Sequence, residues 1–288
     1  MKADVISKVM SGGKSSIGFD RGILRVTGPD RVRFLNGQVT NDVSKISVGQ
    51  NAYAATCTAK GKMIADFWIT NRGEEFWLDT AKGMEGTLKE RLEKYLIADD
   101  VEITVIEGYR LLHCFGAVPE GIEKSEAPVS SLRFRISGFD CWVQNDCSSG
   151  LTDEWDEESF KCLRILNQVP EWGRELTPEI LPPEAGMDRN GIRYDKGCYV
   201  GQEVMARIKS IGHVSKFLVF LESSTEAVPS EGAKLMHEDK NVGWVTSSVF
   251  NPLTGKGIAL GYLSWMAAKS TTTVSADGLS LTIRLEKA

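Results

Sequence analysis

The sequence predicts an α+β fold whose last part is an antiparallel β-barrel. Up to about Lys209, strand-like segments alternate with segments of helical periodicity. After Ile211, short apolar runs are separated by Gly, Ser, Pro and Asn, and no convincing helical pattern follows. Short strands bounded by turn residues are typical of small barrels. We therefore expect a mixed region of two subdomains over residues 1–209 and a barrel over residues 210–288.

Strands and one short helix are expected in the N-terminal part. Residues 17–27 predict a strand pair with a turn at Arg21 and Gly22. Asp30 is a suitable N-cap for a helix over residues 31–37, because a carboxylate accepts hydrogen bonds from the unpaired amides of a first turn. Further strands are expected at residues 53–69 (two strands around a turn at residues 59–62) and at residues 76–79.

The clearest helical pattern covers residues 82–97. Apolar residues recur there every three or four positions, and Glu85 lies one turn before Lys89. A second helix is expected over residues 152–167, because its acidic first turn suits the positive end of the helix dipole. The remaining expected strands are residues 101–106, 109–115, 132–136 and 141–143.

Composition and charge exclude several classes of protein. The chain has 288 residues and a net charge of −5, so it does not resemble a binder of phosphate backbones, and we expect no direct nucleic-acid partner. Residues 1–14 lack a signal-peptide pattern. No apolar run reaches the roughly 18 residues that a membrane span needs. We expect a cytoplasmic or organelle-matrix protein with no membrane partner.

The sequence offers no pattern for a resident metal. None of the 6 cysteines forms a CxxC pair, and the 3 histidines form no HxH or HxxxH group. We therefore expect no metal site within the chain. Any metal chemistry would be shared with a partner.

The most distinctive segment is DKGCYVGQE at residues 195–203. Lys196 lies two positions before Cys198, and Arg207 lies on a short helix expected over residues 202–209. Nearby cations and a helix N-terminus both favour a thiolate. Cys198 is therefore a candidate reactive thiol, or a donor ligand to a transferred metal centre. The alternative is a small buried residue beside a structural turn.

The run KGCYVGQEVMAR at residues 196–207 resembles the signature of the YgfZ family. Members of this family are folate-binding proteins related to the aminomethyltransferase (T-protein) of the glycine cleavage system. RFLNGQVTND at residues 33–42 and GKMIAD at residues 61–66 resemble the family's N-terminal motifs. The resemblance extends over nearly the whole chain. Further matches lie at residues 163–165, 169–170 and 183–184.

The resemblance implies a cloverleaf, in which an aminomethyltransferase-like folate-binding region and the barrel surround a central pocket. It implies tetrahydrofolate as cofactor and a role in the assembly or repair of iron–sulfur enzymes, including radical-SAM enzymes that modify tRNA. The partners would be a reduced folate and iron–sulfur client enzymes, and we expect a monomer. Cys198 and Lys196 become the catalytic candidates. The candidates for cofactor binding are Asn41, Asp66, Arg164, Tyr199, Gln202, Glu203 and Arg207.

Two departures from the aminomethyltransferases leave open whether the chain is an enzyme. Those proteins carry a pterin-binding Glu where this chain has Leu166, and a pair of acids where it has Ala65 and Asp66. Aminomethyl transfer needs a carboxylate to position and activate the folate nitrogen. A tetrahydrofolate-dependent aminomethyl or one-carbon transferase is therefore the alternative function. A third hypothesis is a scaffold that uses the 196–207 motif for docking.

Several candidates also fit purely structural roles. Asn41 and Asp42 suit either a pocket or a turn, and Asp66 lies on an alternating strand that faces either a pocket or solvent. Lys60 and Lys62 could meet a folate glutamate tail, or they are solvated hairpin lysines. The aromatic residues that either stack on a pterin or pack in a core are Tyr199 and Trp172.

Overall fold

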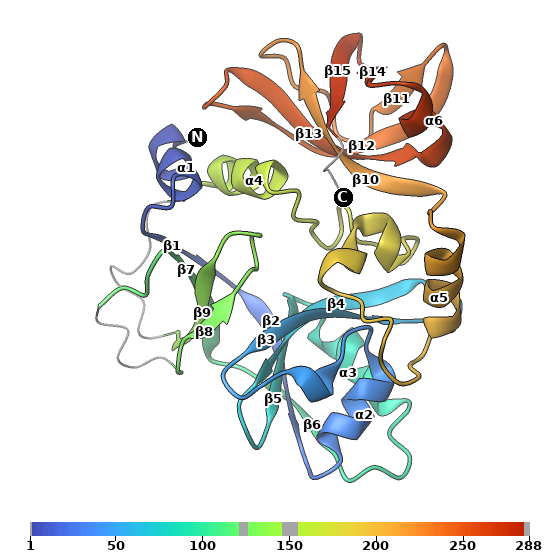
Figure 1. Ribbon diagram of the computed structural model, residues 1–288. Helices are drawn as coiled ribbons and strands as arrows, with labels where there is room; N and C mark the ends of the chain where they lie inside the picture. The colour runs from blue at the N-terminus through green and yellow to red at the C-terminus, as the bar shows by residue number, and fades with distance from the viewer. Residues whose placement is uncertain (1, 121–125, 146–154, 285–288) are drawn as a thin grey trace.

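The computed structural model describes residues 2–120, 126–145 and 155–284. Three β-sheets form three lobes, and the last of them is a closed barrel (Figure 1). The expected α+β architecture with a C-terminal antiparallel barrel is confirmed. None of the helices within the described residues is both long enough and apolar enough to span a membrane.

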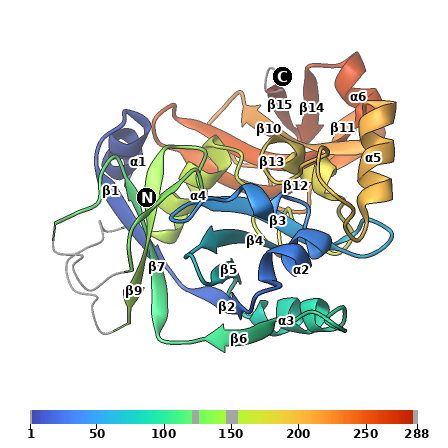
Figure 2. The same cartoon turned by 60° about the horizontal axis from the view of Figure 1, so that its bottom comes forward.

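The first lobe contains a five-stranded antiparallel sheet in the order β3-β4-β5-β2-β6. Helices α2 (Arg31–Gln38) and α3 (Glu85–Glu93) pack on one face of it (Figure 2). Asp30 precedes α2 as expected, but its carboxylate accepts a hydrogen bond from the backbone N–H of Asp100 and does not cap the helix. The strands are β2 (Arg21–Thr27), β3 (Asn51–Cys57), β4 (Met63–Asn71), β5 (Phe76–Ala81) and β6 (Glu102–Ile106).

Alternation along β4 decides which side chains face the centre of the molecule. Ala65 and Phe67 are fully buried in the core that includes Leu88 of α3. Successive side chains of a strand point to opposite faces, so Asp66 and Trp68 lie on the face away from the helices. Burying an aromatic side chain such as Phe67 contributes about 1.5–3 kcal/mol, which fixes this orientation.

The second lobe is a four-stranded sheet in the order β1-β7-β9-β8. The expected pairing within residues 17–27 is wrong: β1 pairs with β7, whereas β2 pairs with β5 and β6. Only Asp20 separates the two strands, which is too short for a hairpin turn, so the chain passes from one sheet into the next. The expected strand at residues 132–136 is also wrong, because the pairing ends at Ser131. The strands are β1 (Ser15–Phe19), β7 (Tyr109–Phe115), β8 (Val129–Ser131) and β9 (Gly138–Gln144).

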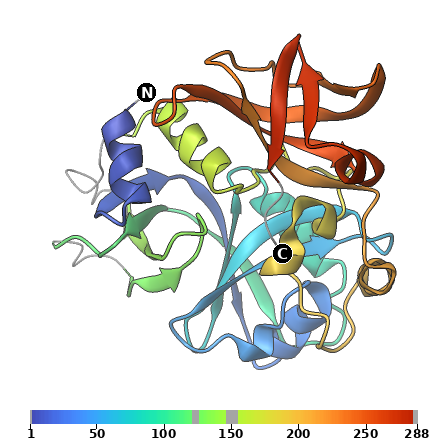
Figure 3. The same cartoon turned by 45° about the horizontal axis from the view of Figure 1, so that its top comes forward.

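Two helices join this sheet to the barrel. Helix α1 (Ala3–Met10) was not expected; it packs against α4 (Glu157–Leu166), which lies on barrel strands β12 and β13 (Figure 3). Helix α4 is shorter than expected because Asp156 caps it, accepting a hydrogen bond from the backbone N–H of Ser159 at 2.7 Å. Residues 152–154 of the expected helix lie outside the described residues. Three short 3₁₀ helices lie in connecting segments: η1 (Val43–Lys45), η2 (Pro182–Ala185) and η3 (Met187–Arg189).

Helix α5 (Gln202–Ile211) leads into a six-stranded closed barrel. The expectation of no helix after Ile211 is wrong, because α6 (Trp265–Ser270) lies between two barrel strands. Six residues are too few to produce a recognisable helical period. The barrel strands are β10 (Lys216–Ser223), β11 (Lys234–His237), β12 (Lys240–Asn251), β13 (Lys256–Ser264), β14 (Thr273–Ala276) and β15 (Leu279–Arg284).

Candidate functional site

A cavity of about 270 Å³ lies where the two open sheets meet the segment between α4 and η3, and we call it the central cavity. Just over half of its lining residues are apolar or aromatic, and the others are mostly charged. This combination is typical of a small-molecule site. The aromatic side chains that line it are Phe19, Tyr53, Trp68, Phe134, Phe160 and Trp172.

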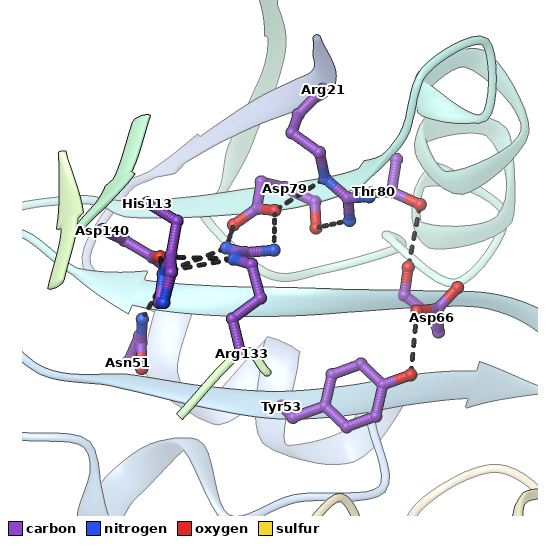
Figure 4. Close-up of polar contacts among 9 residues, drawn as sticks. All are labelled: Arg21, Asn51, Tyr53, Asp66, Asp79, Thr80, His113, Arg133 and Asp140. Carbon is purple, nitrogen blue, oxygen red and sulfur yellow. Dashed lines mark hydrogen bonds and ion pairs between the residues drawn. The ribbon is translucent and has the colours of Figure 1, made fainter. Parts of the chain in front are cut away.

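Asp66 is a buried carboxylate in this cavity. Its Oδ2 accepts a hydrogen bond from the Tyr53 hydroxyl at 2.9 Å, and the Thr80 hydroxyl donates to its backbone carbonyl at 2.8 Å (Figure 4). Its Oδ1 is buried and has no hydrogen-bond partner among the described residues. An unpartnered buried acceptor costs about 1–3 kcal/mol, so this oxygen favours a ligand that donates to it.

Burial shifts the pKa values of both Asp66 and Tyr53. It raises the pKa of Asp66, and the nearby Arg21 opposes the shift only in part. Burial, together with Asp66, raises the pKa of Tyr53 well above its ordinary value. Tyr53 therefore remains a hydrogen-bond donor and holds Asp66 in a fixed orientation.

A buried ion-pair network forms one wall of the cavity. Arg133 donates to both carboxylate oxygens of Asp79 at 2.9 Å and to Asp140 at 2.8 Å (Figure 4). Asp79 is on β5 and Asp140 is on β9, so Arg133 ties the two open sheets together. Arg21 donates to Asp79 at 3.0 Å, and His113 Nδ1 lies 2.7 Å from Asp140.

Within this network, the attraction between opposite charges outweighs the effect of burial on the pKa values of Asp140 and Arg133. Burial alone would raise the pKa of Asp140, but Arg133 and His113 outweigh it and hold that pKa well below its usual range. Burial alone would lower the pKa of Arg133, but Asp140 and Asp79 raise it further. Asp140 and Arg133 therefore stay charged, and Arg133 is fixed where residues 132–135 line the cavity.

Arg164 lies at the edge of the cavity but already has protein partners. Its guanidinium, in a residue only 2% exposed, donates to Glu175 at 2.7 Å and to Ser247 at 2.6 Å. It thereby joins α4 to the following segment and to barrel strand β12. Glu171 also lines the cavity, with its Oε2 3.4 Å from Arg164 Nε. Glu171 is an acid that sequence reasoning missed, although it directly follows the family's Val-Pro element.

Asn41 is buried and acts within the protein. Its side-chain amide donates to the carbonyl oxygens of Tyr53 at 2.7 Å and Asn190 at 2.9 Å. It therefore holds the strand that carries Tyr53. Asn41 lines a second cavity beside the first one and is not part of the central lining.

Lys196 anchors the beginning of the 196–203 segment. Its Nζ donates to the backbone carbonyls of Asn36 at 2.7 Å, Val39 at 2.9 Å and Asn41 at 2.6 Å. Burial lowers the pKa of Lys196 to about 8, with Asp42 opposing the shift. The ammonium group thus binds the end of α2.

Cys198 is exposed, and the residues on both sides of it are anchored. Tyr199 is buried, and its hydroxyl has no hydrogen-bond partner among the described residues. Gly201 has φ +91°, and a Cβ there would lie 2.7 Å from the carbonyl oxygen of Thr58. Only glycine fits this close approach, so the backbone on either side of Cys198 is held in place.

The remaining candidates lie on α5. Gln202 donates to the carbonyl of Lys196 at 3.5 Å, whereas Glu203 and Arg207 are exposed. Neither these residues nor Cys198 lie among the described residues that line the central cavity. The candidates therefore form three groups: Asp66 and Arg164 line the central cavity, Asn41 lines the second cavity, and the remaining candidates belong to residues 196–207.

Comparison with known proteins identifies the family. The GCVT N-terminal domain model matches residues 21–118, and the glycine cleavage T-protein C-terminal barrel domain model matches residues 216–286. Together these matches cover more than half of the chain. The tRNA-modifying protein YgfZ of Klebsiella pneumoniae is 28% identical, over 75% of this chain and 73% of that protein. An aminomethyltransferase of Halalkalibacterium halodurans is 28% identical, over 84% of this chain and 76% of that protein. The chain belongs to the glycine cleavage T-protein (GCVT) family and is similar to its YgfZ and aminomethyltransferase members alike.

A solved structure supports the fold of this T-protein family member. The glycine cleavage system aminomethyltransferase T of Bartonella henselae superposes with a TM-score of 0.80, covering 98% of this chain and 88% of that chain. Its sequence identity is 18%, so this likeness concerns the fold alone. The expected aminomethyltransferase-like fold is confirmed.

Both departures noted from the aminomethyltransferases lie away from the cavity lining. Leu166 packs with Ile6 and barrel residues, and Ala65 belongs to the core beneath α2 and α3.

Sequence reasoning also missed Tyr53 and Arg133 as cavity residues. Strand alternation could have found Tyr53, because its neighbours Ala52 and Ala54 have small side chains that face the core. The Tyr53 side chain must then point to the opposite face of the sheet, toward the cavity. Arg133 follows the end of a strand, where no such alternation applies.

Among the described residues, no group of three or more His, Cys, Asp or Glu side chains is arranged to hold a metal ion. The described cysteines other than Cys198 are all buried. Cys198 could therefore contribute only one ligand to a metal centre, with the other ligands coming from a partner.

Proposed function

We propose that this protein is a tetrahydrofolate-binding accessory protein for the assembly or repair of iron–sulfur enzymes, and that it presents Cys198 to them. Its clients would include radical-SAM enzymes that modify tRNA. The iron–sulfur part of the proposal rests on the resemblance of residues 196–207 to the family signature. The folate part rests on the central cavity.

The observation that carries the folate proposal is the unpartnered Oδ1 of Asp66 in an aromatic-lined cavity. A pterin ring offers adjacent N–H donors along one edge, as guanine does, and a carboxylate is their natural acceptor. The flat ring also suits Trp68 and Phe134, which line the same cavity. These residues fit a reduced folate.

The protein's own groups would orient this ligand. Tyr53 holds one oxygen of Asp66 and leaves the other directed at the ligand. Arg133 keeps the cavity wall in place through Asp79 and Asp140. A bound reduced folate would supply a carrier for a one-carbon unit.

Cys198 would act separately, at the surface. As a thiolate it can donate an electron pair to iron while its proton passes to water. Because the neighbouring residues are anchored by Lys196 and Gly201, the sulfur can meet a partner without reordering the backbone.

Calorimetric titration with tetrahydrofolate or 5-formyltetrahydrofolate tests the folate proposal. We expect micromolar binding that weakens roughly tenfold or more in Asp66→Ala, because the variant loses a charge-assisted acceptor. Glu226→Gln, an exposed carboxyl on the barrel lobe, is the matched control and should bind normally. Absence of binding to the wild type at high micromolar concentration would refute this proposal.

Complementation tests the role of Cys198. Cells that lack the native protein should recover iron–sulfur enzyme activity with the wild type, but not with Cys198→Ala. Ser210→Ala, an exposed substitution of similar size on α5, should restore activity. Full recovery with Cys198→Ala would eliminate the thiol and favour a scaffold that docks through the same motif.

A second candidate is a tetrahydrofolate-dependent aminomethyl or one-carbon transferase. It is favoured by Glu171 and Asp20, which give the cavity two carboxylates besides Asp66. Purified protein, tetrahydrofolate and an aminomethyl donor provide the direct assay. Turnover that is lost in Glu171→Gln would support this candidate, and no turnover by the wild type would remove it.

A further inference from the structure

Helix α5 follows directly on the Cys198 segment and lies at the surface of the protein. Gly201, three positions after Cys198, is its N-cap, and Met205 is the buried residue of the helix. Its inner side packs on the turn at residues 58–62, where a Cβ on Gly61 would lie 2.9 Å from the Val204 side chain. The outer side carries the exposed residues Glu203, Ala206, Arg207, Lys209, Ser210 and Ile211.

Helix α6 extends this exposed face beyond the end of α5 (Figure 1, Figure 2). The ring of His213, which follows α5, stacks on Trp265 of α6 with the ring centroids 5.0 Å apart. At this junction Ile211 of α5 is 58% exposed and Met266 of α6 is 76% exposed. We call α5, α6 and the turn at residues 58–62 the α5–α6 surface. Its apolar side chains lie in water beside a rigid aromatic stack.

The charge of the α5–α6 surface is opposite in sign to that of the whole chain. The chain carries a net charge of −5. On this surface the carboxylate is Glu203, and the cations are Lys60, Lys62, Arg207, Lys209 and Lys269. Among the described residues, none of these cations has an ion-pair partner. Their charge is therefore available to an acidic partner.

Lys60 and Lys62, which sequence reasoning offered for a folate tail, belong to this surface. Neither lysine lines the central cavity or the second one. Lys62 Nζ donates to the backbone carbonyl of Glu179 at 2.5 Å, whereas Lys60 is exposed. Lys60 therefore adds positive charge beside α5 and not within a ligand cavity.

One partner is large enough to contact Cys198 and the apolar end of this surface together. Helix α5 has 10 residues, which at 1.5 Å per residue gives a length of about 15 Å. A stable protein–protein interface covers about 800 Å² of each partner, which is roughly 30 Å across. A protein that docks at Cys198 therefore covers α5 as well.

We propose that the α5–α6 surface docks the iron–sulfur client through an acidic face of that client, with apolar side chains of the client packed on Ile211 and Met266. This inference rests on the proposed function, because the client is the protein to which Cys198 is presented. Opposite charges accelerate the encounter and fix its orientation, and the apolar contacts slow dissociation. A thiolate-ligated iron–sulfur cluster is itself negatively charged, so the same cations favour its approach to Cys198.

A nucleic acid, the other large polyanion, suits this surface less well. Proteins that read RNA commonly stack its bases on free aromatic rings. Here the Trp265 ring already stacks on His213, and Lys269 Nζ lies 4.6 Å from its centroid. Exposed side chains such as Met266 are instead typical of the centre of a protein–protein interface.

Calorimetric titration of the full-length protein with purified, cluster-loaded radical-SAM tRNA-modifying enzymes of the same organism tests this inference. We expect micromolar binding of a client that weakens about tenfold in Lys209→Glu/Lys269→Glu and about threefold in Met266→Ser. High salt should also weaken the binding, because the charges are exposed. None of these residues lines either cavity, so the affinity for tetrahydrofolate should not change.

Lys14→Glu and Ile97→Ser are the matched controls. Lys14 precedes β1 and Ile97 follows α3; both are exposed, and neither belongs to the α5–α6 surface. Both variants should bind the client as the wild type does. All the substituted residues are exposed, so circular dichroism should show unaltered folding.

Labelling of Cys198 shows whether the docked client covers the thiol. Bound client should slow the reaction of Cys198 with N-ethylmaleimide about tenfold, because the interface excludes the reagent. At the same client concentration, Lys209→Glu/Lys269→Glu should lose most of this protection. Client binding that leaves the labelling rate unchanged would place the interface elsewhere and overturn the inference.

The remaining outcomes separate this inference from the proposed function. Equal client affinities for the wild type and the surface variants, or no client binding at all, would overturn the docking surface. Loss of iron–sulfur enzyme activity in cells with Cys198→Ala would still leave the proposed function intact. Surface-dependent client binding with full activity of Cys198→Ala would support the surface and refute the role of the thiol. Binding of tRNA, lost in Lys209→Glu/Lys269→Glu and without any client binding, would assign the surface to RNA and overturn the inference.

Discussion

The ammonium group of Lys196 lies 2.6 Å from the carbonyl oxygen of Asn41. The same group donates to Asn36 and Val39 at the end of α2, where carbonyl groups lack partners within the helix. The first residue of the family signature therefore ties the Cys198 segment to a helix that lies more than 150 positions earlier in the chain.

Lys196→Met should destabilise the protein. Three carbonyl oxygens would lose a charged donor while remaining partly buried, and we expect the free energy of unfolding to fall by about 2 kcal/mol. Urea denaturation measures this change. Lys60→Met, an exposed lysine on the β3–β4 turn, should change it by less than about 0.5 kcal/mol. Equal denaturation midpoints for the two variants would contradict the anchoring role.

Arg133→Met should have a larger effect. It leaves the buried carboxylates of Asp79 and Asp140 without their main partner, and breaking a buried ion pair in this way costs about 3–5 kcal/mol. Adding Asp79→Asn and Asp140→Asn to Arg133→Met removes the uncompensated charges and should recover much of the loss. Urea denaturation again provides the measurement. A triple variant that is less stable than Arg133→Met would show that the carboxylates contribute independently of Arg133.

Local patterns predicted much of the fold. Alternation in β4 placed Asp66 opposite the core residues, and turn residues indicated the barrel, because both depend on neighbours in the sequence. The pairing of β1 and β2 was not predictable in the same way. Each strand is well formed locally, but its partner lies in another sheet and is chosen by long-range packing.

In the candidate site too, the sequence predicted local features but not the contacts between distant segments. The signature predicted an accessible Cys198, and the structure places that residue at the surface. It did not predict the role of Lys196, whose partners are backbone carbonyls far away in the sequence. Arg133 and Asp79 were missed because no sequence spacing links residues that meet only when two sheets pack together.

Cys198 should react far faster with N-ethylmaleimide than the buried cysteines. Burial raises the pKa of Cys57 and of Cys162 to about 12, which suppresses their thiolates in addition to shielding them. Peptide mapping by mass spectrometry after brief labelling should find Cys198 modified at least about tenfold more than either of these residues. In urea the difference should disappear. Comparable labelling of Cys57 in the native protein would contradict this prediction and show that the β3–β4 hairpin, which Gly201 approaches closely, opens readily.

Asp66→Asn should stabilise the free protein at neutral pH while weakening folate binding. Burial raises the pKa of Asp66 above its ordinary value of 3.8, so its carboxylate ionises more readily in the unfolded chain than in the folded one. Below the ordinary pKa both states are protonated and the folded state carries no penalty. As the pH rises above the ordinary pKa, the unfolded chain loses its proton while the folded protein retains it, so the wild type loses stability relative to Asp66→Asn until the pH passes the raised pKa.

The difference in unfolding free energy between Asp66→Asn and the wild type should therefore grow from pH 4 to pH 7. Urea denaturation at several pH values measures it, and the exposed Glu226→Gln substitution should show no comparable trend. A difference that stays constant with pH would mean that Asp66 has the same pKa in the folded and unfolded protein. If the predicted trend is observed and folate affinity falls about tenfold, the cavity retains a destabilising carboxylate because the ligand needs it as an acceptor.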